Sequence, residues 1–70
     1  MDVIIHTFDR NRYIINIDES DLVMVILVKL KDLINIDIEK SKLIYSGILL
    51  NPNKTIESYG IKNNENIHLV

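Results

Sequence analysis

Short apolar runs separated by polar turns occupy the first part of the chain. The segments 2–7 and 12–18 are rich in isoleucine and valine, a composition typical of β-strands. The residues between them, 8–11, are polar apart from one phenylalanine, so we predict an antiparallel hairpin. Because side chains alternate between the two faces of a strand, Ile4 and Ile14 should form a cross-strand pair on one face.

A longer apolar run follows and predicts a helix that begins at residue 22 or 23 and ends at residue 33 or 34. Ser20 or Asp21 is the expected N-terminal cap, and acidic residues suit the positive end of the helix dipole. Asn35 follows the helix and tolerates the left-handed conformation common at helix ends.

The segment Lys42–Leu50 predicts a second hairpin with a turn at Ser46 and Gly47. This register places Ile44 opposite Leu49 and leaves both faces of the hairpin largely apolar. Only one face of a small sheet can cover the core, so the second apolar face requires another explanation.

The remaining elements complete an α+β order. Residues 51–60 predict a loop with one short helical turn, and residues 66–70 predict a last strand. The order β-β-α-β-β-short helix-β indicates one helix lying across one face of a mixed sheet.

Four segments of the chain are distinctive in combination: ESD at 19–21, LIYSG at 43–47, TIESYGI at 55–61 and IHLV at 67–70. With them the chain resembles the ubiquitin family, whose length and element order it matches over all 70 residues. The resemblance implies one ubiquitin-like domain, residues 1–70, with a β-grasp fold of order ββαββ-3₁₀-β. The chain is also similar to the N-terminal ubiquitin-like domains of proteasome shuttle proteins and ubiquilins.

The resemblance gives the second apolar face a role in protein binding. It implies an Ile44-centred patch on the outer face of the sheet that docks onto ubiquitin-binding domains. Strand alternation agrees, because Ile67 and Leu69 face the core and the residues beside them face outward. The expected protein-binding residues are Phe8, Lys42, Ile44, Gly47, Leu49, His68 and Val70.

The partners that this resemblance implies are ubiquitin-interacting helices, ubiquitin-associated domains or proteasome receptor subunits. We expect transient binding with a dissociation constant of about micromolar. The partners imply a role in protein degradation, in the cytoplasm or the nucleus. The alternative is a covalent modifier whose C-terminal Gly-Gly tail lies outside this sequence, and a non-binding scaffold comes third. We favour the interaction module because most positions of ubiquitin's chain-forming lysines hold other residues here, namely His6, Asn11, Leu27, Leu33, Ile48 and Asn63, with only Lys29 kept.

A possible second surface combines apolar residues of the helix and the sheet. Val23, Ile26 and Leu30 are spaced for one buried helix face, which turns other apolar residues partly outward. One interpretation is a monomer with scattered exposed apolar residues, which are common on protein surfaces. The other is a second contact surface, for a neighbouring domain or for weak self-association. The residues of this second surface are Ile4, Ile14, Met24, Val25 and Val28.

Composition and motifs argue against nucleic-acid binding, a membrane span and enzyme activity. The net charge is −2 with acids and bases interspersed, so no nucleic-acid interface is expected. The longest apolar run, residues 22–30, is too short to span a bilayer. Ser46 and Ser58 lack a recognisable base, and there is neither a cysteine nor a glycine-rich phosphate loop. We therefore expect no enzyme activity and no cofactor.

The two histidines fall on the same outer face by alternation. His6 lies on the first strand and His68 on the last, and these strands are neighbours in the fold that the resemblance implies. A weak metal site or a pH switch is one interpretation. Two solvated histidines explain the pattern better, because the sequence places no third ligand beside them. No metal site is expected.

Overall fold

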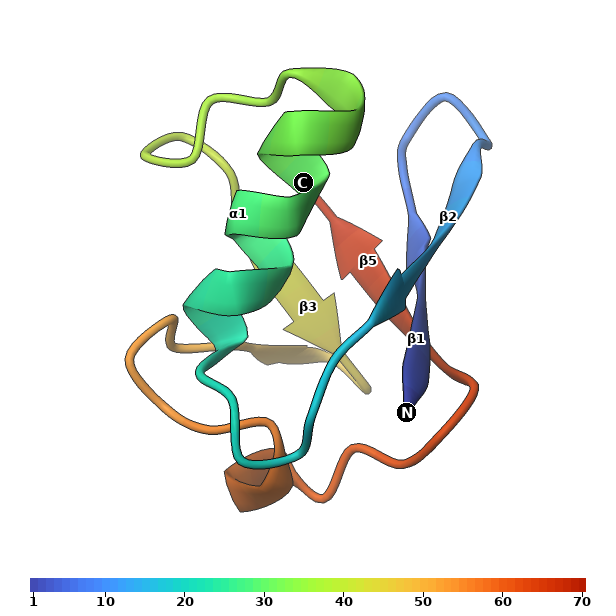
Figure 1. Cartoon of the computed structure of the whole chain (residues 1–70). Coiled ribbons are helices and arrows are strands. Elements are labelled where there is room, and N and C mark those ends of the chain that lie inside the picture. Colours follow the sequence, from blue (N-terminus) through green and yellow to red (C-terminus); the bar gives the residue numbers. More distant parts are fainter.

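The computed structural model describes all 70 residues as a five-stranded sheet crossed on one face by a single α-helix (Figure 1). The strand order is β2-β1-β5-β3-β4. The central strands β1 and β5 run parallel, and all other neighbours are antiparallel. The predicted α+β order is confirmed, with elements β1 Asp2–His6, β2 Arg12–Asn16, α1 Val23–Ile34, β3 Leu43–Tyr45, β4 Ile48–Leu49, the 3₁₀ turn η1 Glu57–Tyr59 and β5 Glu65–Leu69.

The core fills the space between α1 and the inner face of the sheet and contains no buried polar residue. Each aliphatic side chain removed from water there contributes about 1.5–3 kcal/mol. Neither helical segment has the length and apolar character that crossing a bilayer requires. The core residues are Val3, Ile5, Ile15, Ile17, Val23, Ile26, Leu27, Leu30, Leu43, Leu50, Ile56, Ile61 and Ile67.

The prediction that Ser20 or Asp21 caps α1 is wrong. Leu22 occupies the N-cap position, and no side chain bonds the first turn of the helix. The carboxylate of Asp21 instead accepts a hydrogen bond from the backbone N–H of Asp18, at 3.0 Å. Asp21 therefore stabilises the turn that precedes the helix.

Backbone carbonyls of the loop after β4 replace the missing side-chain cap. The Val23 N–H donates to the Lys54 carbonyl at 2.9 Å, and the Met24 N–H donates to the Pro52 carbonyl at 3.0 Å. These amides would otherwise lack partners within the helix. At the other end of α1, Asn35 adopts the predicted left-handed conformation, with φ of 56°. The helix start is thus bound to the loop after β4 by two long-range hydrogen bonds.

The hairpin of β3 and β4 has the predicted register. Ile44 pairs with Leu49, and Tyr45 pairs with Ile48. The connecting turn, Ser46–Gly47, has positive φ at both residues, 51° and 78°, as expected for a type I′ hairpin turn. This register fixes which side of the sheet each hairpin residue faces.

Candidate protein-binding surface

One row of side chains crosses the outer face of the sheet from β2 to β4. The strand registers place Arg12 beside His6, His6 beside His68, His68 beside Ile44, and Ile44 beside Leu49. The chain neighbours of the central members of this row are in the core, so alternation turns the row away from α1. Leu49 is 55% exposed at its end. The structure therefore brings together three of the predicted binding residues.

Val70 and Lys42 extend this surface next to Ile44. Each donates its backbone N–H to the carbonyl of the other, at 2.9 Å in both directions. The Val70 side chain is 62% exposed, and Lys42 is exposed as well. Val70 also lines a shallow groove of about 320 Å³ together with Phe8. This groove connects the sheet surface to the β1–β2 turn.

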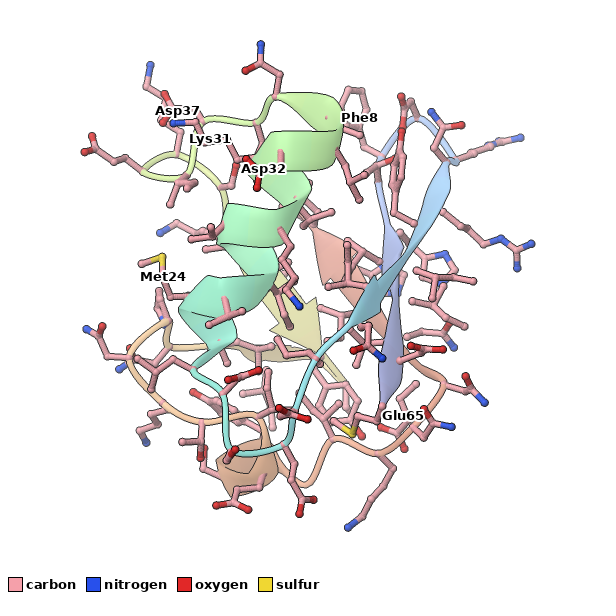
Figure 2. All side chains as sticks on the ribbon, viewed as in Figure 1. Phe8, Met24, Lys31, Asp32, Asp37 and Glu65 are labelled. Atoms are coloured by element: carbon pink, nitrogen blue, oxygen red, sulfur yellow. The ribbon has the colours of Figure 1, made fainter.

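Phe8 is 94% exposed on the β1–β2 turn and lies near the C-terminal end of α1 (Figure 2). Hydrogen bonds hold the turn that carries it. The Thr7 hydroxyl donates to the Asp9 carboxylate, and the Asn11 side-chain amide donates to the same group at 3.0 Å. The bond from Thr7 is the main cause that lowers the pKa of the Asp9 carboxyl below its ordinary value. An ordered turn thus presents an aromatic side chain to solvent.

The tip of the β3–β4 hairpin forms the other border of the surface. Gly47 is exposed there with open space around its Cα. Ile48 is core-side by alternation, yet it is exposed because it lies at the hairpin tip. All seven predicted binding residues therefore lie on or at the edge of the outer sheet face.

The two histidines form a stacked pair at the centre of this face. The rings of His6 and His68 are 5.2 Å apart between centroids, with an angle of 30° between their planes. His6 Nε2 lies 2.7 Å from Asn66 Oδ1, which fixes the orientation of its ring. No group of three or more His, Cys, Asp or Glu side chains is placed to hold a metal ion. The pair gives the surface a flat aromatic centre next to Ile44.

Asn66 was not anticipated as part of this surface, although alternation could have placed it there, two residues before His68. Ile36 was also missed, and it lines the shallow groove beside Phe8. It follows the end of α1 in an irregular connection, where no periodicity indicates the direction of a side chain.

The residues predicted to form a second surface lie on two different sides of the molecule. Ile4 and Ile14 pair on the outer sheet face, next to the histidines. Met24 and Val25 are partly buried against the core, and Val28 is the one helix residue of this set that is exposed. The prediction that these five residues form one surface is wrong, because α1 covers the inner face of the sheet and Ile4 and Ile14 point to the outer face.

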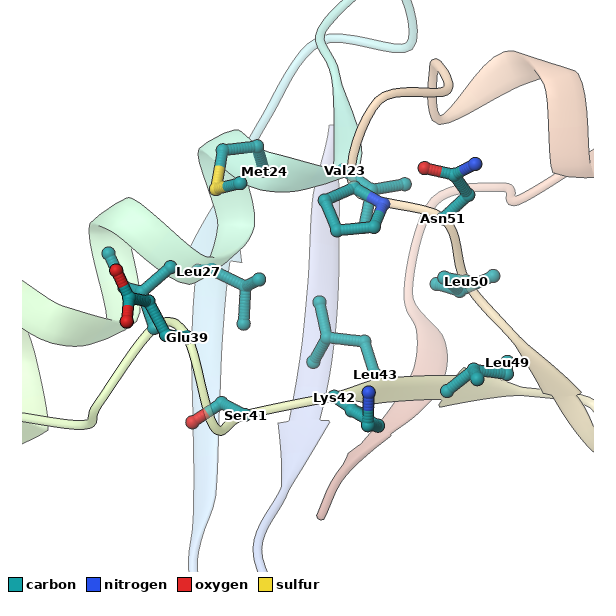
Figure 3. Close-up of a pocket in the computed structure, with 12 residues that line it drawn as sticks. Val23, Met24, Leu27, Glu39, Ser41, Lys42, Leu43, Leu49, Leu50 and Asn51 are labelled. Atoms are coloured by element: carbon teal, nitrogen blue, oxygen red, sulfur yellow. The ribbon is translucent and has the colours of Figure 1, made fainter.

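A groove of about 470 Å³ lies between α1 and the β3–β4 hairpin (Figure 3). Leu27 and Leu43 line it from the core, and Met24 borders it on the helix side. Lys42 and Leu49 line the groove too, so they connect it to the outer face. No local pattern in the chain indicates this groove, because its walls come from segments far apart in the sequence.

Comparison with known proteins agrees with this geometry. The family model described as "Ubiquitin family" matches residues 3–70. No curated protein matches the chain significantly. The match covers nearly the whole chain, and the mixed sheet with one crossing helix is the arrangement that a ubiquitin-like domain requires. The chain therefore belongs to the ubiquitin family.

Proposed function

We propose that this ubiquitin-like domain is a protein-interaction module that docks through the Ile44-centred outer face of its sheet. The observation that carries the proposal is the continuous outer row in which His68, Ile44 and Leu49 lie on adjacent strands. Val70 and Phe8 extend the surface to one side of this row. The proposed partners are ubiquitin-interacting helices, ubiquitin-associated domains or proteasome receptor subunits, in the cytoplasm or nucleus.

The energetics support a modest, reversible interface. Val70, Leu49 and Phe8 are more than half exposed, and covering such side chains contributes about 1.5–3 kcal/mol each before the costs of association are subtracted. Lys42 at the border supplies a charged rim, and an apolar centre with a polar rim is the usual composition of protein interfaces. A small patch of this kind is consistent with an affinity of about micromolar.

An NMR titration of the ¹⁵N-labelled chain with a ubiquitin-interacting helix tests the proposal. We expect the largest shift changes at Ile44, His68 and Val70. The Ile44→Ala variant should bind the helix at least about tenfold more weakly, since it removes a central apolar contact. Val28→Ala is the matched control, because Val28 is an exposed aliphatic residue on α1.

The proposal fails if the shift changes avoid the outer face of the sheet, or if Val28→Ala weakens binding as much as Ile44→Ala does. The absence of any response at millimolar peptide would favour a scaffold that does not bind these partners. Circular dichroism of both variants must first show a folded domain.

A covalent modifier is the second candidate, because the family match fits this role as well. The backbone of Val70 lies at the surface beside Lys42, so a tail after Val70 would extend into solvent. This role requires a Gly-Gly end shortly after Val70 in the native sequence. Conjugates detected by mass spectrometry would support it, whereas a further domain at that place would support the interaction module.

A further inference from the structure

Strand β2 forms an open edge of the sheet. Just beyond its ladder with β1, Met1 and Ile17 exchange both backbone hydrogen bonds, at 2.9 and 2.8 Å. In an antiparallel ladder, every second residue pair exchanges bonds in this way. The register of β1 and β2 therefore turns the backbone groups of Arg12, Ile14 and Asn16 away from β1, toward the free edge.

These outward groups are largely unpaired. The only hydrogen bond to one of them comes from Lys29, whose Nζ lies 2.6 Å from the Asn16 carbonyl. The N–H and C=O of Ile14, at the centre of the edge, have no protein partner. An exposed strand edge of this kind is a template for pairing with another chain.

We propose that β2 pairs with β2 of a second copy of this chain, antiparallel about a two-fold axis at Ile14. In this register Ile14 exchanges both backbone bonds with Ile14 of the second copy, and Arg12 pairs with Asn16 of that copy. The carbonyl of Asn16 has two lone pairs, so it accepts the new bond and keeps the bond from Lys29. The two sheets become one continuous sheet.

Charge complementarity favours the second copy as the occupant. On the outer face, Arg12 comes to lie opposite Asn16 and diagonal to Asp18 of the other copy, within the reach of long side chains. Asn16 donates its side-chain amide to Asp2 at 3.0 Å, so a second carboxylate lies behind it. The edge thus has a basic end and an acidic end, and antiparallel pairing brings them together twice.

Apolar contacts lie on both sides of this edge. The Ile14 side chain is 67% exposed on the outer face. It would contact Ile14 of the second copy across the two-fold axis. On the other side of the edge, Lys29 approaches from α1. Leu33, one helical turn further along α1, is exposed on the same side of the helix. Pairing would shield both apolar side chains from water.

The paired sheet would present two outer faces in the same direction, because a two-fold axis perpendicular to the sheet keeps both on one side. Two docking surfaces would then bind a tandem receptor with higher avidity than one. This consequence rests on the proposed function, whereas the pairing itself does not.

Sedimentation velocity of the 70-residue chain between about 0.01 and 1 mM tests the pairing, since an interface of one strand pair is small and weak. We expect a monomer–dimer equilibrium within this range. Ile14→Lys should abolish the dimer, because it places like charges directly opposite each other. Arg12→Asp should weaken it by roughly three- to thirtyfold, and the double variant Arg12→Asp/Asp18→Arg should restore it. Val28→Lys is the control with no expected effect.

Hydrogen exchange then reports on the backbone. The Ile14 and Asn16 amides should become protected as the concentration rises, whereas dilute samples should exchange rapidly at both. A monomer at every concentration overturns the inference, as does a dimer in which these amides stay unprotected. A dimer abolished by Ile44→Lys but not by Ile14→Lys would place the interface on the docking face and would also overturn it. No receptor is present, so none of these results depends on the proposed function.

Discussion

The inner and outer faces of the sheet carry isoleucine at neighbouring positions of the same strands. Ile5 is fully buried on the inner face of β1, and its neighbour Ile4 is partly exposed on the outer face. On β2, Ile15 is buried and Ile14 is largely exposed. The residue type is the same on both faces, so composition alone cannot separate the core from a contact surface.

The difference between the faces comes from α1, which covers only the inner one. There, side chains from the helix and the sheet share one closely packed core. On the outer face, the apolar side chains are separated by His6, His68 and Asn66, which keep much of that face polar. The outer face therefore leaves its apolar side chains open to solvent, whereas the inner face holds the fold together.

Alanine substitutions at Leu43 and Ile44 should reveal this difference most strongly. Leu43 is buried between the helix and the sheet, and Leu43→Ala should lower the free energy of unfolding by about 2–5 kcal/mol. Ile44 points outward and is partly exposed, so Ile44→Ala should cost less than about 1.5 kcal/mol. Urea unfolding followed by circular dichroism measures both values. Equal losses at the two positions would contradict the assignment of the faces.

The strand pairings and faces are the features that the sequence pattern predicted best. The turn predicted at Ser46 and Gly47 placed Ile44 opposite Leu49, alternation put His6 and His68 on a common face, and the registers confirm both. Alternation succeeds because a shift of one residue would expose a whole set of core side chains. The helix was predicted within one residue at each end for a similar reason, since one of its faces must be buried.

Contacts between distant segments could not be predicted in this way. The start of α1 is satisfied by carbonyls of Pro52 and Lys54, and a local rule for N-terminal caps cannot anticipate a loop that arrives from elsewhere. The groove beside Leu27 also depends on how the helix lies against the hairpin. The open edge at Ile14 likewise depends on the strand order, in which β2 lies at the end of the sheet.

A smaller effect is expected at the hairpin tip, where the chain turns between the paired residues Tyr45 and Ile48. Gly47 has φ of 78°, and a Cβ there would meet no atom within 4 Å. Gly47→Ala should therefore lower stability by about 1–2 kcal/mol through backbone conformation alone. Gly47→Asn should cost less, because asparagine tolerates this conformation. Thermal unfolding of the two variants measures the difference, and equal losses would indicate a steric cause instead.

The smallest effect is expected at Tyr45, whose ring lies at the rim of the inner face. Its hydroxyl donates a hydrogen bond to the Glu65 carboxylate. This bond is the main cause that raises the pKa of Tyr45 above its ordinary value of 10.0, and partial desolvation and the charge of Glu65 add to it. Because the folded pKa is the higher one, the contribution to stability is fully present below about pH 10 and is lost as the pH rises through the folded pKa.

Comparison of the wild type with Tyr45→Phe therefore isolates a polar contact at the border between the two faces. Urea unfolding should show a small stability advantage of the wild type that is constant from pH 7 to about pH 9. Above about pH 10 this advantage should shrink, because ionised Tyr45 can no longer donate to Glu65 and is repelled by it. Absorbance at alkaline pH should show one tyrosine fewer among the late-titrating groups of the variant. An advantage that persists unchanged at pH 11 would contradict this prediction, because it would mean that the hydroxyl stabilises the fold without donating to Glu65.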